Sequence, residues 1–206
     1  LNVLVIGETI IDEYNFCEAL GKSGKEPVLV LRDLDTARYL GGAVAISNHL
    51  AEFCNEIKLL TILGEKREFL KEIKKGISKN IKLDFIAKKN SPTILKKRFL
   101  DHVSLNKILG VYKLNDDPMK KDQEKKLNIK LKKLIKNYDL VIVSDYGHGF
   151  ISEQAAKIIC SNSKYLALNA QINSSNVGYH TLKNYRNVDC LIINQKEIRH
   201  ELRNRT

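Results

Sequence analysis

Short apolar runs and amphipathic segments alternate along most of the chain. Asn2–Ile6, Glu56–Leu63 and Ile81–Ile86 are rich in Val, Ile and Leu and alternate little with polar residues. Such runs are typical of strands that are buried on both faces of a parallel sheet. Between these strands, residues 43–53 and 66–78 carry apolar side chains at the spacing of one helical face. The alternation predicts an α/β fold with a mainly parallel sheet and right-handed crossovers.

The middle of the chain breaks this rhythm. Thr93–Leu100 and Lys107–Leu114 read as two strands without an intervening helix, and they alternate in places between apolar and polar residues. An antiparallel sheet with one solvated face has that pattern, so these strands are expected to form a small satellite sheet with Val28–Leu31. The rhythm then resumes, and three further buried strands are predicted at Tyr138–Ser144, Lys164–Leu168 and Cys190–Ile193.

Composition excludes some classes of protein. With 206 residues and 43% hydrophobic content, the chain can bury one substantial core. Its apolar runs are too short to span a membrane, and its first residues do not form a signal peptide. The four cysteines have no metal-like spacing, so reduced thiols in a cytoplasmic protein are the simplest interpretation.

The formal net charge of +11 raises the question of nucleic-acid binding. Much of the excess lies in Lys120–Lys136, where Leu and Ile form one helical stripe and lysines cover the rest. That pattern is typical of an amphipathic helix with a solvated basic face. No aromatic residues interleave with these lysines, as stacking on single strands requires. We therefore do not expect nucleic-acid binding, whereas an anionic small substrate suits the charge equally well.

The segment Gly21-Lys22-Ser23 resembles the end of a phosphate-binding P-loop. That motif requires a glycine five residues before Gly21, where this chain has Phe16. The residues that follow Ser23 lead into a predicted strand instead of a helix. We therefore reject the P-loop interpretation.

Candidate binding residues stand where predicted strands end. Asp12 follows the first strand and Asp145 follows another, and ligands of open α/β sheets bind outside the carboxyl ends of the strands. Asp12 is a candidate for binding hydroxyl groups, with a loop or capping aspartate as the alternative. Gly41 and Gly42 open a predicted helix. Without a Cβ they let backbone N–H groups approach a ligand, although a simple turn is the commoner explanation.

Three more polar residues have two interpretations each. Asn194 and Glu197 lie at i and i+3 of a predicted first helical turn, so both could reach a hydrated magnesium ion or a phosphate group. The alternative, which the residues alone favour, is an N-cap with its capping box. Arg98 lies on the satellite sheet. Its planar guanidinium suits a phosphate or carboxylate, with a solvated side chain as the alternative.

Four short motifs together resemble the ribokinase/PfkB family of carbohydrate kinases. In chain order they are Gly7-Glu8-x3-Asp12, Gly41-Gly42-Ala43, Ser144-Asp145-Tyr146-x-His148-Gly149 and Asn194-x-x-Glu197. The most similar subgroup is the kinase half of bifunctional heptose-7-phosphate kinase/nucleotidyltransferase proteins of bacterial surface-sugar pathways. The resemblance covers essentially the whole chain. It implies a ribokinase-like three-layer α/β/α fold with a Rossmann-like sheet, as one truncated domain over residues 1–206, and a β lid with strands from about 13–40 and 93–114.

The resemblance also implies an activity, which is transfer of the γ-phosphate of ATP to a sugar hydroxyl with Mg2+ as cofactor. Sugar or sugar-phosphate contacts would come from Asp12, Gly41, Gly42, Asn48, Arg98 and Asp145. Asn194 and Glu197 would lie near the nucleotide and the magnesium ion, with Glu197 as the metal residue. The expected partners are a second copy of the chain through the lid and a fused nucleotidyltransferase domain, in nucleotide-sugar biosynthesis.

The chain also departs from the family pattern. Ala45 stands where an Asn is usual, His148 where a Lys is frequent, and Asn169-Ala170-Gln171 where relatives often have an Asp-Pro-Lys-like segment. The Gly-Ala-Gly-Asp segment that supplies the family's catalytic base has no counterpart in the 206 residues, so we assign no catalytic residue. We therefore expect the C-terminal part of the fold to be absent and the 206-residue chain alone to be inactive. The alternative to a kinase is a catalytically silent sugar-binding module of a larger bifunctional protein.

Overall fold

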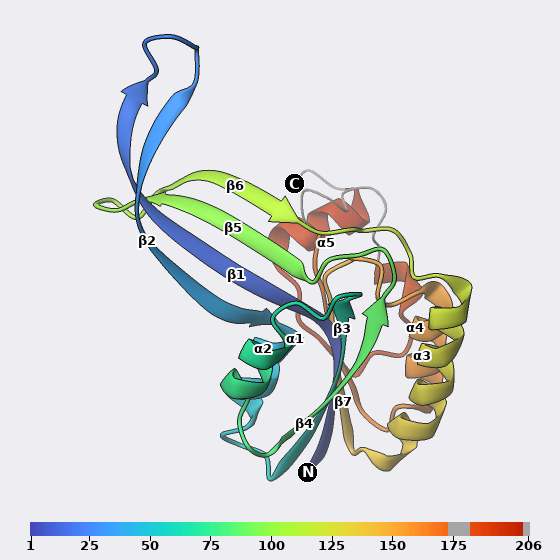
Figure 1. Ribbon diagram of the computed structural model, residues 1–206. Helices are drawn as coiled ribbons and strands as arrows, with labels where there is room; N and C mark the ends of the chain where they lie inside the picture. Colours follow the sequence, from blue (N-terminus) through green and yellow to red (C-terminus); the bar gives the residue numbers. More distant parts are fainter. Residues whose placement is uncertain (173–181, 204–206) are drawn as a thin grey trace.

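The computed structural model describes residues 1–172 and 182–203, and it has the predicted α/β architecture (Figure 1). Within these residues, the central sheet has six parallel strands in the order β4-β3-β1-β7-β8-β9. The strands are β1 (Asn2–Lys22), β3 (Glu56–Gly64), β4 (Ile81–Lys88), β7 (Leu140–Asp145), β8 (Leu166–Ala170) and β9 (Cys190–Leu191). The predicted parallel sheet is thus confirmed.

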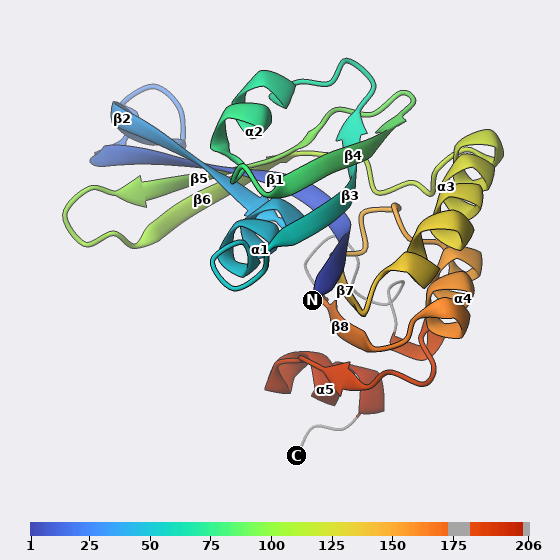
Figure 2. The ribbon, with the colours of Figure 1, turned by 90° about the horizontal axis from the view of Figure 1, so that it is seen from below.

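Helices cover both faces of this sheet (Figure 2). One face carries α1 (Ala43–Leu50) and α2 (Leu70–Gly76), and the other carries α3 (Lys121–Leu134) and α4 (Glu153–Asn162). Val3 and Val5 of β1 join the core under α1 and α2, whereas Leu4 and Ile6 join the core under α3 and α4. Because both faces are buried, these strands show the continuous apolar runs seen in the sequence. The other helical elements of the described residues are η1 (Ile135–Asn137), η2 (Leu182–Asn184) and α5 (Gln195–Leu202).

A second sheet, here called the outer sheet, projects from this three-layer body (Figure 1). It consists of the second half of β1 together with β2 (Leu29–Gly42), β5 (Ile94–Asp101) and β6 (Lys107–Lys113). β2 is antiparallel to β1, β5 is parallel to β1, and β6 is antiparallel to β5. The satellite sheet expected from the sequence is therefore present, with β1 as an additional strand.

The first strand does not end at Gly7, as the sequence suggested, but continues for 21 residues in all. A Cβ at Gly7 would collide with the carbonyl oxygen of Ser144 on β7, so this glycine reflects close strand packing instead of a turn. In the outer half of β1 the buried positions include Glu13, whose carboxylate pairs with Arg38 and Lys97. Because a charged residue is buried there, this part of the sequence lacks the apolar pattern from which a buried strand is predicted.

Other boundaries also differ from the prediction. The helix expected from Lys66 begins at Leu70, because Arg67 and Phe69 have φ angles of 53° and 65°, which an α-helix does not allow. α1 ends at Leu50 instead of near Phe53. Val28–Leu31, expected as a short strand of the satellite sheet, overlaps a longer strand, β2, which runs from Leu29 to Gly42. Among the described residues, none of the helices combines the length and the apolar character that a membrane crossing needs.

Candidate functional site

The candidate site lies where β1 passes from the central sheet into the outer sheet. Glu8, at this passage, is fully buried, and its two carboxylate oxygens accept hydrogen bonds from the backbone N–H groups of Tyr146 (2.9 Å) and His148 (3.0 Å). Burial, reinforced by the nearby charge of Asp145, raises the pKa of Glu8 to about 8. Glu8 therefore fixes the loop after β7 against β1. Its role was missed because its partners lie about 140 residues along the chain.

Asp145 ends β7 beside Glu8 and is also buried. Its Oδ2 accepts a hydrogen bond of 2.6 Å from the hydroxyl of Tyr185, and its Oδ1 accepts one of 3.0 Å from the N–H of Gly147. Burial and the charge of Asp145 raise the pKa of Tyr185 well above its ordinary value. Tyr185 therefore acts as a hydrogen-bond donor here, and nothing in the sequence around it marked this contact.

Asp12 and Arg98 form an ion pair on one face of the outer sheet, between Oδ1 and Nη1. Both side chains are half-buried, and the Arg98 guanidinium also stacks over the Tyr14 ring at 5.4 Å from its centroid. Burial is the largest single effect and lowers the pKa of Arg98, but the hydrogen bond and charge of Asp12, together with the nearby Tyr14 and Tyr112, outweigh it, so the pKa of Arg98 is raised. The structure thus brings together two residues that the sequence singled out separately.

Gly41 and Gly42 lie antiparallel to the start of this segment of β1. A Cβ at Gly41 would meet the carboxylate of Asp12, and a Cβ at Gly42 would meet the carbonyl oxygen of Glu8. Gly42 also has a φ of +62°, which disfavours other residues, and it is the N-cap of α1. The glycine pair therefore allows β2 to pack closely against Asp12 before the chain turns into α1.

Asn48 makes different contacts. Its side chain donates a hydrogen bond to the carbonyl of Gly76 (2.9 Å) and accepts one from the N–H of Ser78 (3.1 Å). These bonds hold α1 against the end of α2. Both polar atoms of the Asn48 side chain are thus engaged in contacts between helices, and neither bond is with another candidate residue.

An open hollow of about 390 Å³ lies on the Asp12 face of the outer sheet. It is lined by Asp12, Tyr14, Phe16 and Tyr39, and the rings of Tyr14 and Tyr39 pack edge to face at 5.7 Å. Carboxylate and aromatic groups together suit a molecule with several hydroxyl groups and an apolar ring face. The half-buried aromatic residues of β1 are therefore further candidates for the site, which the sequence did not single out.

Lys96 and His148 add two buried groups to this region. The Lys96 Nζ lies 5.6 Å from the centroid of the Tyr112 ring, and burial lowers the pKa of Lys96. The Nδ1 of His148 lies 2.6 Å from Oδ1 of Asp116, while its Nε2 is buried without a partner in the described residues. Burial and then the charge of Lys96 lower the pKa of His148. His148, one of the departures from the family pattern, is therefore an internal residue of the site region.

Asn194 and Glu197 form the capping box that the residues alone favoured. Asn194 Oδ1 accepts from the N–H of Glu197 (2.9 Å), and Glu197 Oε2 accepts from the N–H of Asn194 (3.0 Å). The other oxygen of Glu197 accepts from the N–H of Ile172 (3.3 Å). In the part of the chain that the structure describes, no group of three or more His, Cys, Asp or Glu residues is placed to hold a metal ion.

The fold is similar to that of solved sugar and nucleoside kinases. The structure superimposes on an Escherichia coli phosphofructokinase-2 in complex with substrates and products, with a TM-score of 0.71, 11% identity, and coverage of 99% of this chain and 64% of that one. It also matches the Methanocaldococcus jannaschii nucleoside kinase, an archaeal member of the ribokinase family, with a TM-score of 0.61, 14% identity, and coverage of 98% of this chain and 63% of that one. These likenesses show the fold. No family model matches the chain.

Among curated proteins the relatives are bifunctional proteins named HldE. The chain is 24% identical to that of Campylobacter jejuni over 196 residues, which are 95% of this chain and 40% of the relative. It is 30% identical to that of Nitratiruptor over 166 residues, which are 78% of this chain and 34% of the relative. The chain thus spans about two fifths of the length of the Campylobacter jejuni relative. The predicted resemblance is confirmed by these matches.

Proposed function

We propose that this chain is the N-terminal portion of an ATP-dependent carbohydrate kinase, which phosphorylates an alcohol group of a sugar or sugar phosphate. The observation that carries the proposal is the Asp12–Arg98 pair beside the hollow of the outer sheet, just beyond the residues at which the ladders of β1 to β3 and β7 end. The similarity to the bifunctional HldE proteins along 95% of the chain supports the same conclusion.

The sugar would bind on the Asp12 face of the outer sheet, which would then act as a lid. Asp12 offers carboxylate oxygens to hydroxyl groups, and Arg98 offers N–H donors to a hydroxyl, carboxylate or phosphate. Gly41 and Gly42 would contact the sugar through their backbone, and Asp145 would contribute through the loop that it orders. Phosphoryl transfer depends mainly on positioning and charge neutralisation, and these residues supply the positioning.

The nucleotide would lie at the start of α5, near Asn194 and Glu197. Magnesium is usually held by one or two carboxylates together with substrate phosphates and water, so a single glutamate is a suitable protein ligand for this ion. Both Glu197 oxygens already accept backbone N–H groups, so the remaining lone pairs would reach the ion through water. When bound, the ion would neutralise phosphate charge, while Asn194 and Glu197 keep α5 in place.

We extend the proposal to the setting of the parent protein. We place the parent protein in the cytoplasm, in nucleotide-sugar biosynthesis, with a fused nucleotidyltransferase domain and with pairing of two copies through the outer sheet. Its acceptor would be a sugar or a sugar phosphate, because β5 places the cations Lys96 and Arg98 opposite Asp12 and Tyr14, two residues that line the hollow.

A thermal-shift screen of the 206-residue chain with sugars and sugar phosphates, with and without Mg-ATP, tests the proposal. We expect a sugar or sugar phosphate to raise the unfolding temperature, because ligands that bind only the folded state stabilise it. Asp12→Asn should remove that shift, whereas Asp35→Asn, on the exposed part of β2, should retain it. If no sugar or sugar phosphate stabilises the chain, the proposal is wrong. If a sugar raises the unfolding temperature but Mg-ATP does not change it, the result favours the catalytically silent sugar-binding module instead.

A further inference from the structure

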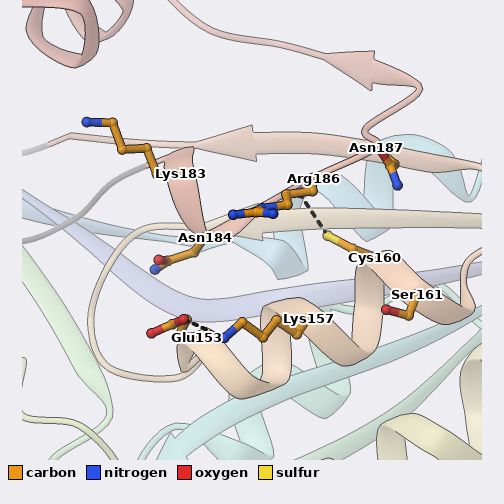
Figure 3. A pocket seen from close by; sticks show the side chains of 8 residues that line it. All are labelled: Glu153, Lys157, Cys160, Ser161, Lys183, Asn184, Arg186 and Asn187. Atoms are coloured by element: carbon orange, nitrogen blue, oxygen red, sulfur yellow. Dashed lines mark hydrogen bonds and ion pairs between the residues drawn. The ribbon is translucent and has the colours of Figure 1, made fainter.

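A polar cavity of about 420 Å³ lies outside the candidate site, between α4 and residues 183–187 (Figure 3). Its volume is in the range of small-molecule pockets. One wall is the exposed side of α4, and the other is the chain that leads from η2 toward β9. Neither the candidate site nor the proposed kinase reaction uses these residues.

Positive charge predominates in this cavity. Lys157, Lys183 and Arg186 line it, with Glu153 as its only carboxylate among the described lining residues. Glu153 Oε1 pairs with Lys157 Nζ at 2.6 Å, so one cation is already neutralised. The guanidinium of Arg186 makes no hydrogen bond or ion pair with the described residues, yet its charge helps to lower the pKa of Glu153, after the larger effect of Lys157. Arg186 therefore lines the cavity as a cation whose guanidinium has no partner among the described residues.

Neutral hydrogen-bond donors also line the cavity. Asn184 and Asn187 come from residues 183–187, and Ser161 comes from α4. Figure 3 shows Asn184 and Arg186 across from the Glu153–Lys157 pair. A planar guanidinium with amide and hydroxyl donors matches the oxygens of a phosphate group. A carboxylate ligand would use fewer of these donors.

The cavity wall is joined to the candidate site through one residue. Asn184 and Arg186 flank Tyr185, which is buried and donates its hydroxyl hydrogen bond to Asp145. The N–H of Arg186 in turn donates to the Sγ of Cys160 on α4 at 3.4 Å. A ligand that draws Arg186 toward α4 would therefore move the backbone that positions Tyr185.

We propose that this cavity binds a phosphorylated small molecule through its phosphate, and that occupancy is relayed to Asp145 through Tyr185. The binding itself is independent of the proposed kinase function. The relay rests on that function, because Asp145 matters only if the candidate site binds a sugar.

Backbone amide NMR of the 206-residue chain, titrated with pyrophosphate and separately with ADP, tests the binding. We expect saturable shifts at Ser161, Asn184 and Asn187. Lys183→Gln with Arg186→Gln should weaken binding roughly tenfold or more. The matched pair Lys132→Gln with Lys133→Gln, on the exposed side of α3, should leave it unchanged. Arg186→Lys, which keeps the charge but loses the planar fork, should fall between.

Three results would overturn the proposal. Absence of saturable shifts at the cavity would exclude the site, and equal weakening by the two double variants would show only diffuse attraction to a basic surface. Tyr185→Phe should keep the shifts at Asn184 but lose those at Asp145, so retention of both would exclude the relay. Asp12→Asn with Arg98→Gln should leave the cavity shifts intact, which separates this site from any failure of sugar binding.

Discussion

The hydroxyl of Tyr185 donates a 2.6 Å hydrogen bond to Oδ2 of Asp145, and it does so inside the core, where both residues are almost completely buried. This bond fixes the end of β7 to the chain that precedes β9. It also leaves the Asp145 carboxylate held by the protein on both oxygens, since Oδ1 accepts from Gly147.

Tyr185→Phe is therefore expected to destabilise the protein by about 1–3 kcal/mol, because it leaves a buried acceptor unsatisfied. Urea unfolding followed by circular dichroism measures the loss. Tyr165→Phe is the matched control, since Tyr165 is 47% exposed and should change stability by less than about 0.5 kcal/mol. Equal effects of the two changes would contradict a structural role for the Tyr185 hydroxyl.

The buried carboxyl of Glu8 predicts a particular pH dependence. Its pKa rises from 4.5 to about 8 on folding, so between these values the folded protein keeps a proton that the unfolded chain releases. Its contribution to stability is present at low pH and is lost as the pH rises, by at most about 1.4 kcal/mol per pH unit.

Glu8→Gln cannot titrate, so the difference in unfolding free energy between wild type and variant should change steadily from pH 5 to pH 8 in favour of the variant. Urea unfolding at several pH values measures this difference. Glu18→Gln, on the exposed part of β1, serves as the control and should show a nearly constant difference. A constant difference for Glu8→Gln as well would mean that Glu8 is ionised throughout.

Gly41→Ala tests the close approach of β2 to Asp12. The new Cβ would meet the Asp12 carboxylate, so we expect a loss of about 1–3 kcal/mol from overpacking and weaker binding of any sugar that Asp12 contacts. Gly24→Ala is the comparison, since nothing lies within 4 Å of a Cβ there. If the two variants unfold at the same urea concentration, the Gly41 backbone has more room than the structure shows.

Asn194→Ala removes the capping box of α5. Loss of an N-cap side chain costs about 0.5–2 kcal/mol, and Asn194→Ser should restore most of it. Thermal unfolding of both variants, with and without Mg-ATP, separates two roles. If Asn194→Ser restores stability but not the rise in unfolding temperature with Mg-ATP, Asn194 contacts the nucleotide as well as capping α5. If Asn194→Ser restores both, capping alone accounts for the role of Asn194.

The sequence alone predicted the parallel sheet, its flanking helices and most strand positions, because apolar runs with both faces buried leave a clear pattern. It could not show that β1 continues past Gly7, since Glu13 is buried by ion pairs that form only in the folded sheet. It found Asp12 and Arg98 but not their pairing, which joins strands 86 positions apart. The contacts of Glu8 and Tyr185 also join residues far apart in the sequence, so they were not predicted. Asn48, predicted as a sugar contact, donates a hydrogen bond to the carbonyl of Gly76 at the end of α2.

The continuity of β1 has a mechanical consequence. Its ladder to β3 ends at Glu8 and its ladder to β7 at Gly7, while its ladder to β2 begins at Thr9 and that to β5 at Ile10. The two sheets thus share one strand with almost no free residue between their hydrogen-bond ladders. No flexible linker within β1 therefore separates the two sheets. A change in the tilt of the outer sheet would have to twist or bend β1 at Glu8–Ile10, close to the Asp12 carboxylate.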